Sequence, residues 1–97
     1  MDESSDHPVS SPRVEALREA ATIIQGARDD VYGGPEDNFA RIAALWSVIF
    51  GQEITLSQVA LAMAAVKMAR LVNSPSHRDS WVDMAGYAAC GSEVSQR

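Results

Sequence analysis

The sequence predicts an all-α protein that folds as an oligomeric four-helix bundle. Hydrophobic residues occupy 46% of the 97 positions but aromatic residues only 6%, so alanine, valine, isoleucine, leucine and methionine supply the apolar mass. Such side chains favour closely packed helices. Apolar residues recur at helical spacing in four segments that prolines and glycines separate. We expect a disordered polar tail over residues 1–12 and a single helical domain over residues 13–95.

The first predicted helix runs from Pro12 to about Arg28. Its apolar stripe consists of Val14, Leu17, Ala21 and Ile24. Arg28 continues this stripe by one turn. An arginine there either extends its head group past the core edge or points into a polar cavity, so Arg28 is a candidate ligand contact.

A loop with two glycines precedes the second helix, which is predicted from Pro35 to Phe50. Gly33 and Gly34 permit positive φ angles, and proline is favoured in the first turn of a helix. Gly51 is expected to end the second helix, because glycine readily adopts the left-handed conformation that closes one.

The third helix has the clearest start signal. Thr55 and Gln58 match a capping box, and Ile54 and Val59 are placed as a hydrophobic staple around it. From Val59 to Val66 the sequence contains no polar residue, which predicts a helix buried on all sides.

The fourth helix is predicted over about residues 77–91, with Ser76 and Asp79 as its cap. At 100° per residue, its polar side holds two carboxylates, a phenol, a glycine and a thiol. These residues are Asp79, Asp83, Gly86, Tyr87 and Cys90. The packed side holds Trp81, Met84, Ala85 and Ala88. The polar side is typical of a lined site or contact surface, and a solvated acidic edge is the alternative.

Charge and composition exclude several classes of function. The net charge is −5 and the basic residues are dispersed, so the basic face that duplex nucleic acid requires is not expected. One cysteine excludes an internal disulfide, and no Cys/His group has zinc spacing. No uncharged apolar run reaches transmembrane length and no signal-peptide core begins the chain, which predicts a cytoplasmic protein without a membrane partner.

Three clusters are candidates for chemistry. The first combines a cation, a phenol, backbone amides at a helix start and a carboxamide: Arg28, Tyr32, Gly33, Gly34 and Asn38. The second is Lys67 with Arg70, which either complements the helix dipole or holds phosphate groups. The third consists of His77, Asp79, Asp83 and Tyr87. Repulsion between the two aspartates would be relieved by a metal ion, or by Lys67 and Arg70 across the turn in a ligand-free salt-bridge network.

The second and third helices carry more apolar surface than a lone small bundle can cover. A chain of this size buries only about 60–65% of its unfolded surface, and exposed alanine-rich faces associate. We therefore expect a homo-oligomer, most simply a dimer with paired central helices.

Four segments of the chain resemble a widespread family of small phage proteins. They are Tyr32–Phe39, Ile42–Trp46, Lys67–Leu71 and His77–Ala88, which carry the motifs YGxPxxNF and HxDSWVDxAGYA. The resemblance covers about residues 14–93, and it implies a protein of the infected host's cytoplasm.

More distantly, the helix with Asp79, Asp83 and Tyr87 is similar to the last motif helix of MazG-like nucleotide pyrophosphatases. Those all-α oligomers hold magnesium on an ExxE and an ExxD motif, and the metal activates water. By this resemblance Asp83 matches the aspartate of ExxD, while Ser80 stands where its acidic partner is expected.

The third helix, where ExxE should lie, contains no acid and carries Lys67 and Arg70 instead. Glu15 and Glu19 on the first helix are a poor substitute. Because the metal-ligand set is incomplete, binding is favoured over hydrolysis.

Three functions are compatible with these sequence features. The favoured one is a protein that holds a linear or cyclic phosphorylated nucleotide without a cofactor, and the phage resemblance implies sequestration of a host immune signal. Phosphates would be held by Arg28, Lys67 and Arg70, a base by Tyr32, Trp81 or Tyr87, and base or sugar by Asn38, Asp79 and Asp83. The second is a Mg²⁺-dependent pyrophosphohydrolase with Asp79 and Asp83 as metal ligands. The third is a non-catalytic interaction protein.

Overall fold

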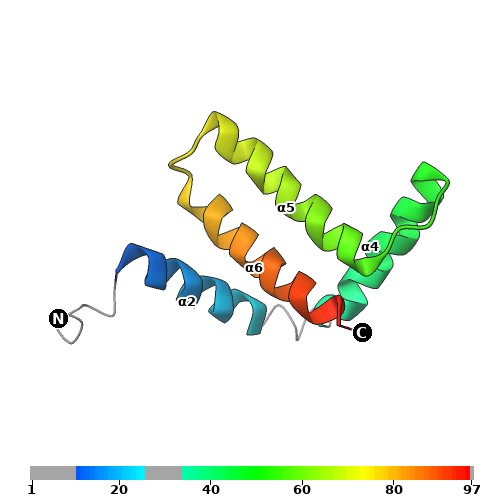
Figure 1. Cartoon of the computed structure of the whole chain (residues 1–97), viewed down its shortest axis with the longest axis horizontal. Coiled ribbons are helices and arrows are strands. Elements are labelled where there is room, and N and C mark those ends of the chain that lie inside the picture. Colours follow the sequence, from blue (N-terminus) through cyan, green and yellow to red (C-terminus); the bar gives the residue numbers. More distant parts are fainter. Residues whose placement is uncertain (1–10, 26–33, 97) are drawn as a thin grey trace.

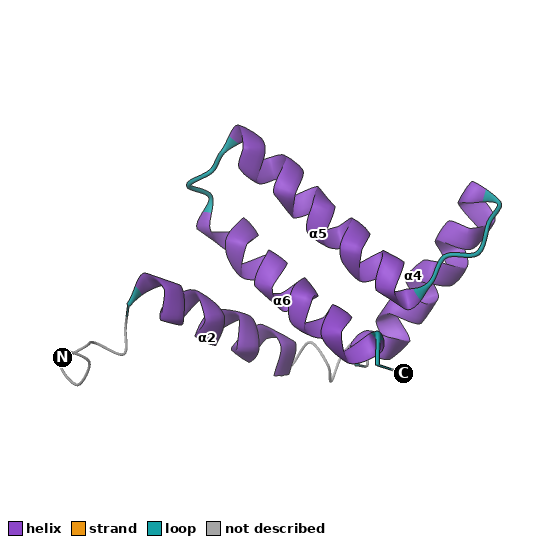
Figure 2. Ribbon diagram, viewed as in Figure 1, coloured by secondary structure: helices purple, strands orange, loops and turns teal. Residues whose placement is uncertain are grey.

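The computed structural model describes residues 11–25 and 34–96, and all regular structure within them is helical (Figure 2). Its four helices are α2 (Pro12–Gln25), α4 (Pro35–Phe50), α5 (Leu56–Asn73) and α6 (Arg78–Val94). They pack together, which confirms the predicted all-α class. Most of the predicted N-terminal tail, the predicted end of the first helix and most of the following loop lie outside the described residues. No helix of the described part is long and apolar enough to cross a membrane.

The helix α6 lies between α5 and α2 (Figure 1). The helices α5 and α6 run antiparallel, and α2 lies on the other side of α6. The helix α4 contacts α5 and the end of α6, and its C-terminal half projects away from the other helices. The described helices therefore form an open arrangement in which α6 contacts each of the other three.

The local start and stop signals of α4 and α5 are confirmed. Thr55 Oγ1 accepts a hydrogen bond from the Gln58 backbone N–H at 3.1 Å, and Gln58 Oε1 accepts one from the Thr55 N–H at 2.8 Å. These are the two reciprocal bonds of a capping box. Pro35 stands in the first turn of α4, and Gly51 closes that helix with a φ of 70°.

The predicted cap of α6 is wrong. His77, rather than Ser76, is the N-cap residue, and its Nδ1 lies 2.8 Å from Ser80 Oγ. Because Ser80 is buried, its hydroxyl group needs a partner inside the protein, and the imidazole supplies one. The helix also extends three residues beyond the predicted end, to Val94, which is buried in the core.

The main core lies where α4, α5 and α6 meet. Its buried residues are Phe39, Ala43, Val59, Ala60, Cys90 and Val94. Gly91 on α6 allows α5 to approach closely, because a Cβ atom there would lie 3.0 Å from the Ala60 Cβ. A Cβ atom on Gly86 would make an ordinary 3.5 Å contact with Ile24 Cγ2 on α2.

Three burial predictions are wrong, two of them because the helices do not close into a compact bundle and the third because the indole N–H of Trp81 bonds to the preceding turn. The helix α5 is not buried on all sides, since Leu61 is 70% exposed. Leu17 of the predicted α2 stripe is 62% exposed. Trp81, assigned to the packed side of α6, is 51% exposed, whereas Gly86 and Cys90 on the predicted polar side are buried.

Candidate functional site

The cationic end of α5 and the acidic flank of α6 meet. Lys67 Nζ lies 3.0 Å from Asp83 Oδ2, and the two side chains keep 24% and 34% of their surface exposed. Antiparallel packing of α5 and α6 causes this meeting, because it sets the C-terminal half of α5 against the N-terminal half of α6. The two predicted clusters therefore share one end of the molecule.

Two further predicted residues lie near this pair. Arg70 follows Lys67 by one turn and Asp79 precedes Asp83 by one turn, and both side chains are exposed. Neither forms an ion pair with another residue in the described part of the chain. We call Lys67, Arg70, His77, Asp79 and Asp83 the charged corner.

The remaining predicted ligand residues do not join the charged corner. Tyr87 is partly buried and packs against the main core cluster. Asn38 lies in the first turn of α4, beside the core residue Phe39, and its backbone N–H donates to the Gly34 carbonyl at 3.1 Å. That core adjoins the opposite end of α6 from Lys67. Arg28 and Tyr32 lie outside the described residues.

Side chains of α6 fix the turn that carries the charged corner. The Trp81 indole N–H donates to the Pro75 carbonyl at 2.9 Å, and the His77 backbone N–H donates to the Ser74 carbonyl at 3.0 Å. The His77 ring is held by Ser80. Sequence reasoning missed the His77–Ser80 contact, although the three-residue spacing at a helix start is a detectable signal.

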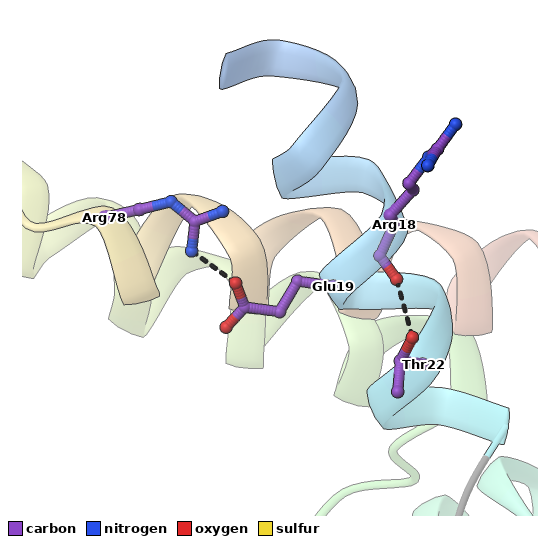
Figure 3. Close-up of polar contacts among 4 residues, drawn as sticks. All are labelled: Arg18, Glu19, Thr22 and Arg78. Atoms are coloured by element: carbon purple, nitrogen blue, oxygen red, sulfur yellow. Dashed lines mark hydrogen bonds and ion pairs between the residues drawn. The ribbon is translucent and has the colours of Figure 1, made fainter. Parts of the chain in front are cut away.

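An ion pair between α6 and α2 was also missed. Arg78 bonds to Glu19, and Figure 3 shows the two side chains reaching toward each other from the two helices. The hydrogen bond and the charge of Glu19 raise the pKa of Arg78. No local pattern could have predicted a pair separated by 59 residues. Glu19, considered earlier as a substitute metal ligand, is thus occupied by an arginine.

The carboxylates of α6 lack a third acidic partner. Asp83 is engaged by Lys67, and Asp79 is one turn away. In residues 11–25 and 34–96, no group of three or more His, Cys, Asp or Glu side chains is placed to hold a metal ion. Magnesium is commonly held by one or two protein carboxylates together with waters and substrate phosphates, but Asp83 is already paired with the Lys67 ammonium group.

A second candidate region is apolar. Eight large apolar side chains of α4 and α5 each expose more than half of their surface. We call them the α4–α5 apolar surface: Leu45, Val48, Ile49, Phe50, Leu61, Val66, Met68 and Val72. An open groove of about 460 Å³ lies between the two helices. It is lined by Trp46, Ile49, Phe50, Ile54, Gln58 and Ala62.

Fold and candidate sites together define a class: a small all-α protein with a charged interhelix corner and a large exposed apolar surface. Residues 15–95 match the family model described as "Domain of unknown function (DUF6378)", and the chain belongs to that family. It is similar to the Gene 55 protein of Mycobacterium phage D29, with 46% identity over 74 residues, which are 76% of this chain and 49% of the relative.

The Gene 55 protein of Mycobacterium phage L5 is 42% identical over 73 residues, covering 74% of this chain and 47% of the relative. The chain thus spans about half the length of these curated relatives. No solved structure matches it.

Proposed function

We propose that this chain is a non-catalytic interaction module that presents the α4–α5 apolar surface to a protein partner. The observation that carries the proposal is the exposure of eight large apolar side chains on two adjacent helices. Large apolar side chains scattered singly over a surface are ordinary, whereas their concentration on two adjacent helices marks an interaction site.

The charged corner supports a structural role for its central residues. Lys67 is already paired with Asp83 across the α5–α6 interface. A phosphate group that bound Lys67 would have to displace this carboxylate or share the cation with it. The pair is therefore explained without a ligand, as a contact that aligns α5 with α6 and so supports the apolar surface.

Site-specific photo-cross-linking inside expressing cells tests the proposed function. A photoreactive residue at Val48 or Met68, both exposed on the apolar surface, is expected to form a covalent adduct with a protein partner. The same residue at Leu17, which is 62% exposed on α2, serves as the control and should form none. Equal adduct yields at all three positions, or no adduct at Val48 and Met68, would contradict the proposal.

A second candidate function is binding of a small phosphorylated nucleotide at the charged corner, including sequestration of a host immune signal. It is favoured by Arg70, an exposed guanidinium with no ion pair to another described residue, one turn from Lys67. Arginine and lysine together supply a fork and a point charge for phosphate. The phage origin of the relatives is consistent with such a role.

A thermal-shift screen with linear and cyclic nucleotides tests the second candidate. A ligand at 100 times its dissociation constant stabilises the folded state by about 2.7 kcal/mol, which raises the melting temperature by about 10–20 °C in a chain of this size. Arg70→Ala should abolish this shift. Flat melting temperatures across the panel would exclude the candidate.

The Mg²⁺-dependent, MazG-like hydrolase remains the third possibility, with Asp79 and Asp83 as ligands. It predicts pyrophosphate release that requires Mg²⁺ and disappears in Asp83→Ala. The absence of turnover on all common nucleotides would count against it.

A further inference from the structure

We propose that the partner on the α4–α5 apolar surface is a second copy of the same chain, with the two α5 helices packed antiparallel. This inference rests on the proposed function and names its partner. It follows from the spacing, charge and symmetry of the exposed side of α5.

The exposed side of α5 carries the spacing of a helix-pairing seam. Leu61, Ala65, Met68 and Val72 follow at intervals of four, three and four residues, and all four are exposed. This 3.5-residue average period is that of coiled-coil seams, in which each side chain inserts between residues of a facing helix. At 100° per residue the seam lies opposite Val59, which is fully buried. A straight helix of a partner is therefore expected to pack along this side of α5.

The seam is free of charge. The α5 sequence contains only two charged residues, Lys67 and Arg70, and both lie off the seam. Alanine occupies the flanking positions Ala62, Ala64 and Ala69, while Leu71 is buried within the chain. Two copies of this side can therefore meet without bringing like charges together, and the small flanks let the helices approach closely.

The position of Ala65 selects an antiparallel arrangement. Ala65 lies at the middle of α5, which spans Leu56–Asn73. A two-fold axis there places a small residue where the helices are closest. It also sets Gln58 at the level of Val72 of the partner subunit, and Leu61 at the level of Ala69 of the partner subunit, one residue from the partner's Met68. Antiparallel helix dipoles attract, whereas parallel ones repel.

The open groove continues this seam. Gln58, one turn before Leu61, lines the groove together with Ala62 and the α4 residues Trp46 and Phe50. In the antiparallel pair, Val72 of the partner subunit reaches this groove. Val72 is 85% exposed, the largest value among the exposed large apolar side chains of the described residues. The pairing would therefore bury the side chain with the largest exposed fraction.

The mass of the purified full chain in solution tests the second-copy proposal. We expect light scattering to give twice the 10.4 kDa of one chain. Leu61→Glu should halve that mass, because it buries a carboxylate in the seam. Leu17→Glu is the matched control: Leu17 is 62% exposed against 70% for Leu61 but lies on α2, and the variant should stay dimeric. Circular dichroism should show unchanged helicity in both.

Cysteine cross-linking tests the orientation. Ala65→Cys is expected to form an interchain disulfide with itself, since the two-fold axis brings the equivalent Cβ atoms together. Val72→Cys should not link to itself, but should link to Gln58→Cys when the two variants are mixed. The native Cys90 is buried, so the wild-type chain serves as the control for disulfide formation that does not involve the introduced cysteines. Self-linked Val72→Cys would overturn the antiparallel arrangement.

The outcomes separate this inference from the proposed function. A monomeric wild-type chain at several hundred micromolar, combined with an in-cell adduct to a protein of another mass, overturns the second-copy proposal and leaves the interaction module standing. A monomeric chain without any adduct at Val48 or Met68 overturns both.

Discussion

Lys67 and Asp83 link α5 to α6 through the ion pair at the centre of the charged corner. Their side chains remain partly exposed, so water screens the attraction and the pair stabilises the fold by about 1 kcal/mol or less. Together with the close contact of Ala60 and Gly91, the pair supports the position of α5 along α6.

A double-mutant cycle measures this contribution. Lys67→Ala should lower the free energy of unfolding by about 1–2 kcal/mol, since the change also leaves a half-buried carboxylate without its partner. Combined with Asp83→Ala, the coupling energy should be about 1 kcal/mol. Arg70→Ala, which removes an exposed cation from the same helix end, should cost less than about 0.5 kcal/mol. Coupling near zero in urea unfolding would show that the pair does not align the helices.

Alanine substitutions at Gly91 and Gly86 compare how closely α6 packs against its two neighbours. In either position alanine favours the helical conformation over glycine by about 1 kcal/mol. The new Cβ of Gly91→Ala would meet the Ala60 Cβ at 3.0 Å, and a methyl group cannot rotate away. Overpacking of this kind costs about 1–3 kcal/mol. At Gly86 the nearest contact is an ordinary 3.5 Å.

We therefore expect Gly86→Ala to be neutral or stabilising by up to about 1 kcal/mol, and Gly91→Ala to be less stable than Gly86→Ala by about 1–3 kcal/mol. Thermal or urea unfolding of the two variants decides the ranking. If Gly91→Ala proved the more stable of the two, the close approach of α5 and α6 would be disproved.

At the scale of elements, the helices whose boundaries were predicted correctly are those with local signals. The capping box of Thr55 and Gln58, Pro35 at a helix start and Gly51 at a helix end act within one turn of the chain, so the sequence displays them directly. The start of α6 was not predicted correctly from such local signals. There the buried hydroxyl group of Ser80 needs a hydrogen-bond partner, and His77, the N-cap residue, supplies it.

Burial on α6 was mispredicted for a related reason. Periodicity identifies the faces of a helix but does not say how many neighbours it has. Because α6 lies between α5 and α2, Gly86 is buried against one neighbour while Gly91 approaches the other. Trp81 stays half exposed because its indole N–H bonds to the preceding turn.

The capping box of α5 yields a test at this scale. Thr55→Ala should lower the free energy of unfolding by about 1 kcal/mol, because the backbone N–H of Gln58 loses its acceptor. Thr22→Ala is the control. The Thr22 hydroxyl bonds to the Arg18 carbonyl inside α2 (Figure 3), where alanine is the better helix former, so this change should be neutral or slightly stabilising. Equal losses in both variants would contradict the role given to the cap.

At the scale of the whole molecule, composition predicted an excess of apolar surface but not its location. The expectation that two central helices carry it agrees with the exposed residues of α4 and α5. The candidate site was predicted in part, since Lys67 and Asp83 meet as expected. Tyr87 and Asn38 lie toward the core instead, because single-helix periodicity cannot place residues of different helices relative to one another.

Hydroxyl-radical footprinting tests most directly whether the α4–α5 apolar surface is covered in solution. Met68 on that surface and Trp81 on α6 are 52% and 51% exposed in the single chain, so their accessibility is matched. Each oxidation rate is compared with the rate of the same residue in the unfolded chain. We predict protection of Met68 several-fold stronger than that of Trp81, and loss of this difference in Leu61→Glu. Equal protection of the two residues in the wild-type chain would contradict a covered surface.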